Sequence, residues 1–271
     1  MKEHRISKIS ENTWQIDEFG LVNAFLAEGE DKAALIDTGA GLSDIRNAVR
    51  KLTDKPLEVL LTHSHSDHSG GVYHFIGIPI HMRSEDEGLR LWGMRTDNEF
   101  RRMYVTTRGK ERKEELEALI PKGNPDCTYF KYENIEDGMI IDLGSRALKC
   151  IHTPGHTDGS VSFLDEKNRL LFSGDTVNRS IILMREEDNS LKKVRVLHDT
   201  LLKIRNLSSS FDYLVIGHGS PRLEKSIISD YLEITEGLLN GTLSGKHEER
   251  GFRKGDVIRL GSAELWYRCD S

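Results

Sequence analysis

The sequence predicts an α/β protein in which two β-sheets pack face to face and helices cover their outer surfaces. Two observations support this prediction. Short apolar runs of strand type alternate along the chain with segments whose apolar residues recur at helical spacing. Such alternating strands and helices bury their apolar faces by packing in layers around a shared core. The 271 residues are also enough for one large domain with a sizeable core.

The N-terminal part of the chain combines short strands with one helix. Ser43 is expected to cap a helix that runs to about Leu52, because the apolar residues of this segment share one helical face. A hairpin turn is expected at 29–32, where a glycine precedes three charged residues. The strands are expected at the apolar runs 6–9, 14–16, 22–27, 33–36, 57–61 and 78–81.

The rest of the chain continues the same alternation. Helices are expected at 191–207 and 223–239, and strands at 257–258 and 263–267 form a closing hairpin around Gly261. The other strands are expected at 129–132, 139–143, 147–152, 161–164, 170–172 and 213–216. Two sets of strands therefore alternate with helices, as a layered arrangement requires.

Residues 84–122 have a different character. They carry many charges, and large apolar residues such as Trp92 and Met94 are interleaved among them in a helical rhythm. A helix is expected at 110–120, because Pro121 cannot continue it. We interpret this stretch as a helical insertion that overhangs the functional site, either as a substrate lid or as a packing surface or interface.

The domain organisation follows from these elements. The chain is expected to be one domain, 1–271, with the helical insertion at about 84–122 and a C-terminal helix-hairpin extension at about 222–271. The sequence leaves the oligomeric state open, with a homodimer as one option.

Composition excludes several classes of partner and compartment. The formal net charge of −6 gives no general attraction to nucleic acid or to an anionic membrane, so a small-molecule substrate is expected. No long apolar segment follows the N-terminus, which makes the cytoplasm the expected location. Cys127, Cys150 and Cys269 are odd in number and widely spaced, as is typical of reduced thiols.

The strongest functional signal lies at residues 63–68, directly after an apolar run. His63 and His65 are two residues apart, so in an extended segment they point the same way and can bind one metal ion. Asp67 and His68 follow after the chain turns, so they can face a second ion nearby. A polar loop that is rich in histidine by chance is the alternative, and this density of ligand-type residues disfavours it.

This H-x-H-x-D-H pattern resembles the signature of the metallo-β-lactamase superfamily. That family needs three more ligands in a fixed order, and His156, Asp175 and His218 each follow a strand-like run at matching places. The resemblance covers roughly residues 14–220 and implies a four-layer αβ/βα sandwich, the metallo-β-lactamase fold. The metal ligands that it implies are His63, His65, Asp67, His68, His156, Asp175 and His218.

The resemblance also implies which of these residues bind each metal ion. His63, His65 and His156 are expected to hold the first ion, and Asp67, His68 and His218 the second. Asp175 is expected to bridge the two ions, and Asp37 to support the histidine loop from behind. The mainly nitrogen ligand set favours zinc, two ions per chain, with iron or manganese as alternatives.

The implied activity is hydrolysis by a metal-bound hydroxide, which Asp67 is expected to orient. The sequence is most similar to the glyoxalase II and lactonase branch, which cleaves esters, thioesters or lactones. It departs from that branch after Asp175, where it reads Val-Asn-Arg-Ser and lacks the lactonase-type tyrosine. A phosphodiesterase or nuclease-like hydrolase of the same superfamily and a non-catalytic metal-binding protein remain as alternatives.

Overall fold

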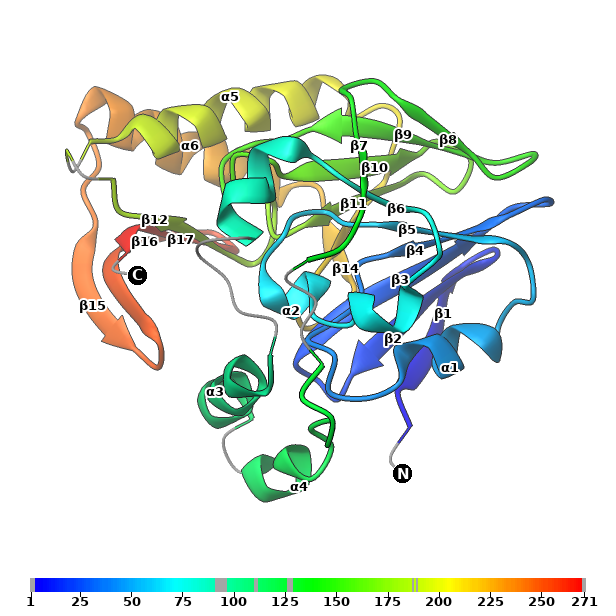
Figure 1. The fold of residues 1–271 in the computed structure, drawn as a ribbon. Helices are drawn as coiled ribbons and strands as arrows, with labels where there is room; N and C mark the ends of the chain where they lie inside the picture. Colours follow the sequence, from blue (N-terminus) through cyan, green and yellow to red (C-terminus); the bar gives the residue numbers. More distant parts are fainter. Residues whose placement is uncertain are drawn as a thin grey trace.

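A computed structural model of the protein describes residues 3–90, 97–109, 112–125, 129–186, 188 and 190–269. Two β-sheets form its centre, and helices cover the outer face of each sheet (Figure 1). The first sheet is antiparallel from β1 to β4 and parallel from β4 to β7. Its strands, in spatial order, are β1 (Arg5–Ser10), β2 (Thr13–Glu18), β3 (Val22–Glu28), β4 (Ala33–Ile36), β5 (Leu57–Leu60), β6 (Ile80–Met82) and β7 (Glu133–Asn134).

The second sheet lies against the first and is mostly antiparallel, apart from the parallel pair β11 and β13. Its strands, in spatial order, are β14 (Arg222–Glu224), β13 (Tyr213–Ile216), β11 (Leu170–Gly174), β10 (Val161–Asp165), β9 (Ala147–His152) and β8 (Ile140–Asp142). Helices α5 (Lys192–Asn206) and α6 (Ile227–Asn240) cover this sheet, and α1 (Ile45–Arg50) covers the other. Within the described ranges, no helix is both long enough and apolar enough to span a membrane.

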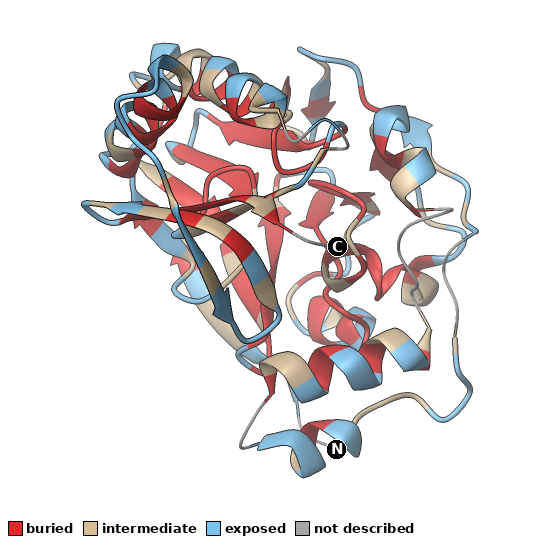
Figure 2. Cartoon of the chain, turned by 90° about the vertical axis from the view of Figure 1, so that its left-hand side faces the viewer, coloured by how far each residue is buried: buried red, intermediate tan, exposed pale blue. Residues whose placement is uncertain are grey.

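Alternation along the strands explains the four layers. Phe163 and Phe172 face the first sheet, and the Phe172 ring lies 5.7 Å from that of Phe25. Their neighbours Leu164 and Leu171 turn the other way and pack with the helices α5 and α6. Because successive side chains of a strand point to opposite faces, strands buried on both sides carry continuous apolar runs. The buried residues accordingly follow the central strands in Figure 2, and the predicted αβ/βα sandwich is confirmed.

A third sheet lies at one side of the sandwich. The predicted closing hairpin forms as β16 (Arg253–Leu260) and β17 (Ala263–Cys269), and β15 (Lys246–Arg250) extends it. β17 also pairs in parallel with β12 (Ser180–Met184), which follows directly after Asp175. The C-terminal hairpin is therefore joined to a segment that begins beside the functional site.

Several local expectations were wrong for identifiable reasons. Asp44, not Ser43, caps α1, because its side chain accepts a hydrogen bond from the Asn47 amide at 3.0 Å. The expected helix at 223–239 begins only at Ile227, because residues 222–224 pair with β13 as the strand β14. The expected strand at 129–132 does not form, and β7 comes after it.

The insertion contains α3 (Asn98–Arg108) and α4 (Lys113–Glu117), whereas Trp92, Met94 and the start of the expected helix at 110–120 lie outside the described residues. Its apolar side chains pack on the loops beside the first sheet, where Tyr104 and Leu116 meet Leu42. Arg101 is fully buried and donates to the carbonyls of Ala40 and Gly70, at 3.1 and 2.9 Å. The insertion is thus fastened to the loop that follows the histidine motif.

We propose that residues 1–271 form one domain, because the C-terminal hairpin shares the core of the second sheet. Leu265 of β17 is 0% exposed and packs in the same cluster as α5 and α6. We expect Leu265→Ala to lower the stability of the whole chain by about 2–5 kcal/mol. Urea unfolding followed by circular dichroism measures this change. Phe252→Ala is the control, because Phe252 is 46% exposed in the turn between β15 and β16 of the same sheet. A main transition that stays in place for Leu265→Ala would contradict the proposal.

Candidate metal centre

The ends of several neighbouring strands meet at one edge of the sandwich. Parallel strands β4 and β5 lead to Asp37 and to the histidine motif, which begins at His63. In the second sheet, the parallel strands β11 and β13 lead to Asp175 and His218. β9 runs in the same direction as β11, since both are antiparallel to β10, and it leads to His156. The carboxyl ends of strands are where α/β sheets commonly place their ligands.

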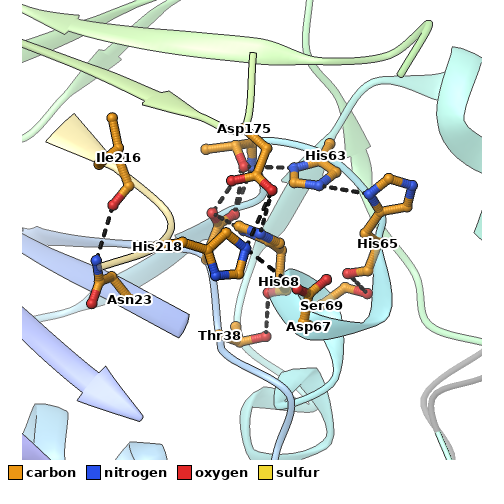
Figure 3. A network of polar contacts seen from close by, with 12 residues as sticks. Asn23, Thr38, His63, His65, Asp67, His68, Ser69, Asp175, Ile216 and His218 are labelled. Atoms are coloured by element: carbon orange, nitrogen blue, oxygen red, sulfur yellow. Dashed lines mark hydrogen bonds and ion pairs between the residues drawn. The ribbon is translucent and has the colours of Figure 1, made fainter. Parts of the chain in front are cut away.

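All seven predicted ligands come together at this edge, as Figure 3 shows for six of them. His63, His65 and His156 form one group, in which the Nδ1 atom of His65 lies 3.0 Å from His63 Nε2 and 2.9 Å from His156 Nε2. Three imidazole nitrogens that point at a common position make a nitrogen-rich site of the kind that zinc prefers. This is the group expected for the first ion.

Asp67, His68 and His218 form a second group, on the other side of Asp175. Their ligand atoms lie within 4.8 Å of one another, and His218 Nε2 is 3.4 Å from Asp67 Oδ2. The short helix α2 (Ser66–Ser69) turns the chain after His65, so Asp67 and His68 reach His218, while the His68 ring stays 4.2 Å from that of His63. This turn is what the spacing of the motif predicted.

Asp175 stands between the two groups. Its Oδ2 atom lies 3.2 Å from His218 Nε2 and 3.7 Å from His68 Nε2 in the second group. The same oxygen lies 3.9 Å from His156 Nε2 in the first group. One carboxylate oxygen is therefore within reach of both groups, as a bridging ligand must be.

Hydrogen bonds behind the rings decide which nitrogen faces the site. The Nδ1 atoms of His156 and His218 each lie 2.8 Å from a backbone carbonyl, of Ile182 and Leu21 respectively. A carbonyl only accepts, so each Nδ1 carries a hydrogen and each Nε2 faces the centre, where it offers a lone pair whenever the ring is neutral. His68 is oriented in the same way, because its Nδ1 donates to Asp37 at 2.8 Å.

Two of these Nε2 atoms, those of His68 and His218, are buried at 3.7 and 3.2 Å from Asp175 Oδ2 without the alignment of a hydrogen bond. Among the described residues, nothing forms a hydrogen bond with the Nε2 atoms of His68 and His218. An unpaired buried nitrogen is costly, and a coordinated cation would satisfy both atoms. The residues present thus fit a metal ion chemically as well as by spacing.

Asp37 supports the motif as the family resemblance implies. Besides holding His68, its carboxylate accepts hydrogen bonds from the Thr62 amide and hydroxyl at 2.8 Å each. Its backbone has a φ of 60°, in the left-handed region that a residue other than glycine seldom adopts. The contacts to Thr62 and His68 hold the side chain in place despite this backbone conformation.

Burial prepares the first group to bind a cation. It lowers the pKa of His65 to about 3, and it holds the pKa of His63 and that of His156 below the ordinary value as well. These rings are therefore neutral near pH 7, which is the form that binds a metal.

The second group has the opposite protonation. Burial alone would lower the pKa of His218, but Asp175 and Asp67 raise it to about 9. The pKa of His68 is likewise raised, since the attraction of Asp37 and Asp175 outweighs burial. A cation that binds to this group must therefore displace protons, so its affinity rises with pH until these rings are neutral.

Sequence reasoning missed two supports of the ligands, one distant in the chain and one close by. The Tyr104 hydroxyl of α3 donates to Asp67 Oδ2 at 3.0 Å, and burial raises the pKa of this phenol, which keeps it a donor. Asn178 donates to the other oxygen of Asp175, Oδ1, at 3.0 Å. Tyr104 is 37 residues from Asp67 in a segment with no motif, so only the folded structure brings it to that ligand. Asn178 follows Asp175 by three residues, and this proximity is the signal that could have found it.

Gly217 has a packing role that its sequence context does not reveal. A Cβ atom there would lie 2.5 Å from the His68 ring and 2.8 Å from Asp175 Oδ1. Contacts this short would force the ligands apart, so only glycine fits before His218.

His152 lies outside the centre, as expected. Its Nε2 atom contacts the carbonyl of Asp158 at 2.9 Å, and its amide donates to Asp137 at 2.8 Å. The turn at 153–155 separates it from His156, which is the histidine that reaches His65.

Residues 17–218 match the model of the metallo-beta-lactamase superfamily. The chain belongs to this superfamily. Members of the superfamily are metal-dependent, and the grouped histidines and aspartates described above are compatible with that chemistry. The family predicted from the H-x-H-x-D-H pattern is thereby confirmed.

Similar proteins within the superfamily include thioester hydrolases. The acyl-coenzyme A thioesterase MBLAC2 of Homo sapiens is 31% identical over 173 residues, which cover 57% of this chain and 58% of that protein. The hydroxyacylglutathione hydrolase GloC of Haemophilus influenzae is 24% identical over 153 residues, 55% of this chain and 63% of that protein. The matches thus span less than two thirds of the length of either relative.

The fold is shared with solved structures of the superfamily. The metallo-beta-lactamase family protein TTHA1429 of Thermus thermophilus superposes with a TM-score of 0.62 at 20% identity. The superposition covers 87% of this chain and 83% of that one. At this identity the likeness shows the architecture alone.

A matched pair of variants tests the assignment of the third histidine. We expect His156→Ala to lose most of the metal of the first group and nearly all turnover, because it removes a ligand. His152→Ala should keep both ions at saturating zinc, since its ring contacts the Asp158 carbonyl instead. Elemental analysis of the purified variants gives the ions per chain. Loss of metal from His152→Ala with full retention in His156→Ala would reverse the assignment.

Proposed function

We propose that this protein is a dinuclear metal-dependent hydrolase that cleaves a thioester, ester or lactone bond. The observation that carries the proposal is the position of Asp175, whose one oxygen lies within 4 Å of ligand nitrogens from both histidine groups. The similar proteins described above, an acyl-coenzyme A thioesterase and a hydroxyacylglutathione hydrolase, support the thioester as the first substrate class to test.

The proposed cofactor is zinc, two ions per chain, with iron or manganese as alternatives. His63, His65 and His156 would hold one ion, Asp67, His68 and His218 the other, and Asp175 both. Divalent ions bound there would polarise the scissile carbonyl and lower the pKa of an attacking water to about 7. The absence of a thiolate and the excess of nitrogen over oxygen ligands favour zinc.

The chain's own residues have separate tasks in this proposal. Asp67 is the proposed catalytic residue, which orients the attacking water through its carboxylate. Tyr104 fixes that carboxylate by its hydrogen bond to Oδ2, so the direction of Asp67 is set before a substrate arrives. Asn178 likewise fixes the carboxylate of Asp175 by donating a hydrogen bond to its Oδ1 atom.

The other expectations stay predictions. Phosphodiester cleavage is not favoured by any observation here, and the net charge of −6 is unhelpful for binding nucleic acid. The cytoplasmic location and the absence of nucleic-acid and membrane partners stay predictions from the sequence, with a homodimer as one option for the oligomeric state.

The experiment is a side-by-side assay of zinc-loaded protein against thioesters, lactones, β-lactams and bis-p-nitrophenyl phosphate. We expect thioesters to be hydrolysed with the highest kcat/KM. Asp175→Asn should lower that activity by about 100-fold or more, because loss of a ligand exceeds the 10–100-fold cost of losing a support behind one. Its circular dichroism should be unchanged, since asparagine is nearly isosteric with aspartate.

Asp158→Asn is the matched control, because Asp158 is exposed on the loop that follows His156. It should retain the activity of the unaltered protein. An Asp175→Asn variant with half of that activity would refute the bridging role. A clear preference for the phosphodiester would replace the proposed function with the alternative.

A further inference from the structure

A pocket of about 200 Å³ opens beside the metal centre. His156, Asp175 and His218 form part of its lining, so a group bound in it lies next to the proposed reaction. The lining also contains three arginines, Arg108, Arg179 and Arg253, which we call the arginine pocket.

The three arginines come from separate parts of the chain. Arg108 is the last residue of α3 in the insertion, and Arg179 lies in the loop between β11 and β12. Arg253 begins β16 of the C-terminal hairpin. The insertion and the C-terminal extension thus both contribute a positive charge to one space beside the metal ligands.

The positive charges of the pocket exceed the negative charges that balance them. Arg253 is paired with Glu264 at 3.1 Å, but Glu264 also pairs with Arg250 and, at 2.7 Å, with Arg259. Neither Arg108 nor Arg179 forms an ion pair with any residue in the described parts of the chain. Among the residues that line the pocket, the one carboxylate is that of Asp175, which is directed toward the ligand histidines.

The arginines are also close enough to affect one another. Burial and then the charge of Arg108 lower the pKa of Arg253. The Arg108 guanidinium lies 4.4 Å from the centre of the Phe252 ring, next to Arg253 in the sequence, so it is held near the hairpin. Like charges gathered at a concave surface repel one another, and a bound anion would relieve the repulsion.

We propose that the arginine pocket binds a carboxylate or phosphate group that the substrate carries close to its scissile bond. Guanidinium groups present paired N–H donors that match the oxygens of such an anion. The proposal rests on the proposed function, because it places the anion on the molecule that is hydrolysed. It narrows the substrate class to thioesters or esters with a negative charge near the carbonyl.

The size of the pocket limits what enters it. About 200 Å³ is below the roughly 300–1,000 Å³ of sites that enclose a complete drug-sized ligand. The pocket therefore suits one charged group on a short linker. That group can belong either to the acyl part of the substrate or to the leaving thiol.

Binding is measured first, independently of turnover. Zinc-loaded protein is titrated calorimetrically with succinate and with inorganic phosphate. We expect the double variant Arg108→Gln, Arg179→Gln to bind one or both with a Kd about tenfold higher or more, because it loses charged hydrogen-bond donors. Arg253 is left intact, since it also donates to Ser180 at 2.6 Å and helps to hold the hairpin.

Arg102→Gln is the matched control, because Arg102 is exposed on the same helix as Arg108 and does not line the pocket. It removes one positive charge from the same helix, where the double variant removes two in all, and it should leave the Kd unchanged. The zinc ions also attract anions, so only the affinity that differs between the double variant and this control reports on the pocket. An equal Kd in both would overturn the proposal.

Turnover then identifies the source of the anion. Three thioesters are compared: butyryl-N-acetylcysteamine is neutral, its succinyl counterpart carries an acyl carboxylate, and butyryl-3-mercaptopropionate carries a thiol carboxylate. We expect one anionic substrate to exceed the neutral one in kcat/KM by about tenfold or more, and this ratio to fall in the double variant but not in Arg102→Gln. Three equal values of kcat/KM in the unaltered protein would contradict the proposal.

The two experiments separate the pocket from the proposed function. If no thioester, ester or lactone is hydrolysed but the double variant loses anion binding, the pocket stands and the proposed function fails. If the neutral thioester is hydrolysed and anion binding is the same in every variant, the function stands and the pocket fails.

Discussion

Asp175 and the histidines around it are buried or half-buried together at the edge of the sandwich, and this shared burial constrains the rest of the structure. Burial pushes ionisable groups toward their neutral forms, and it does so for His63, His65 and His156. The carboxylates keep their charge: burial opposes ionisation, but His218 and His68 hold the pKa of Asp175 well below its usual range. Protons on the second group balance this charge in the metal-free chain, and cations would replace them.

The two sheets bring the ligand side chains close together and hold them apart at fixed positions. Strand ends from both sheets supply the ligands, so their positions are fixed by two sheets that share one apolar core. Contacts behind the ligands set their directions, as with Asp37 behind His68 and Tyr104 behind Asp67. Removing such a support typically costs less than removing a ligand, but it loosens the geometry on which catalysis depends.

The insertion and the C-terminal hairpin add side chains around the metal ligands. The buried Arg101 fastens α3 to the loop after the histidine motif, so Tyr104 and Arg108 are carried by a fixed element. The hairpin is fastened by the parallel pairing of β12 with β17, which brings Arg253 to the same pocket. The insertion, which the sequence suggested as a substrate lid, thus contributes two side chains beside the ligands, Tyr104 and Arg108.

The sequence was sufficient where the information is local. The spacing of His63, His65, Asp67 and His68 predicts both groups, because strand and turn geometry act over a few residues. The layered core was predictable as well, since apolar runs such as 161–164 are long enough to serve two faces. The pairing of β12 with β17, the hydrogen bond from Tyr104 to Asp67 and the arginine pocket depend on residues far apart in the sequence. No local pattern encodes them, and the strand β14 was hidden for the same reason.

The central claim is that Asp175 joins two metal sites. Anomalous diffraction from crystals of the zinc-loaded protein, collected on both sides of the zinc absorption edge, tests it most directly. We predict two peaks, one among His63, His65 and His156 and one among Asp67, His68 and His218, with Asp175 in contact with both. A single peak, or a second peak away from Asp175, would contradict the account.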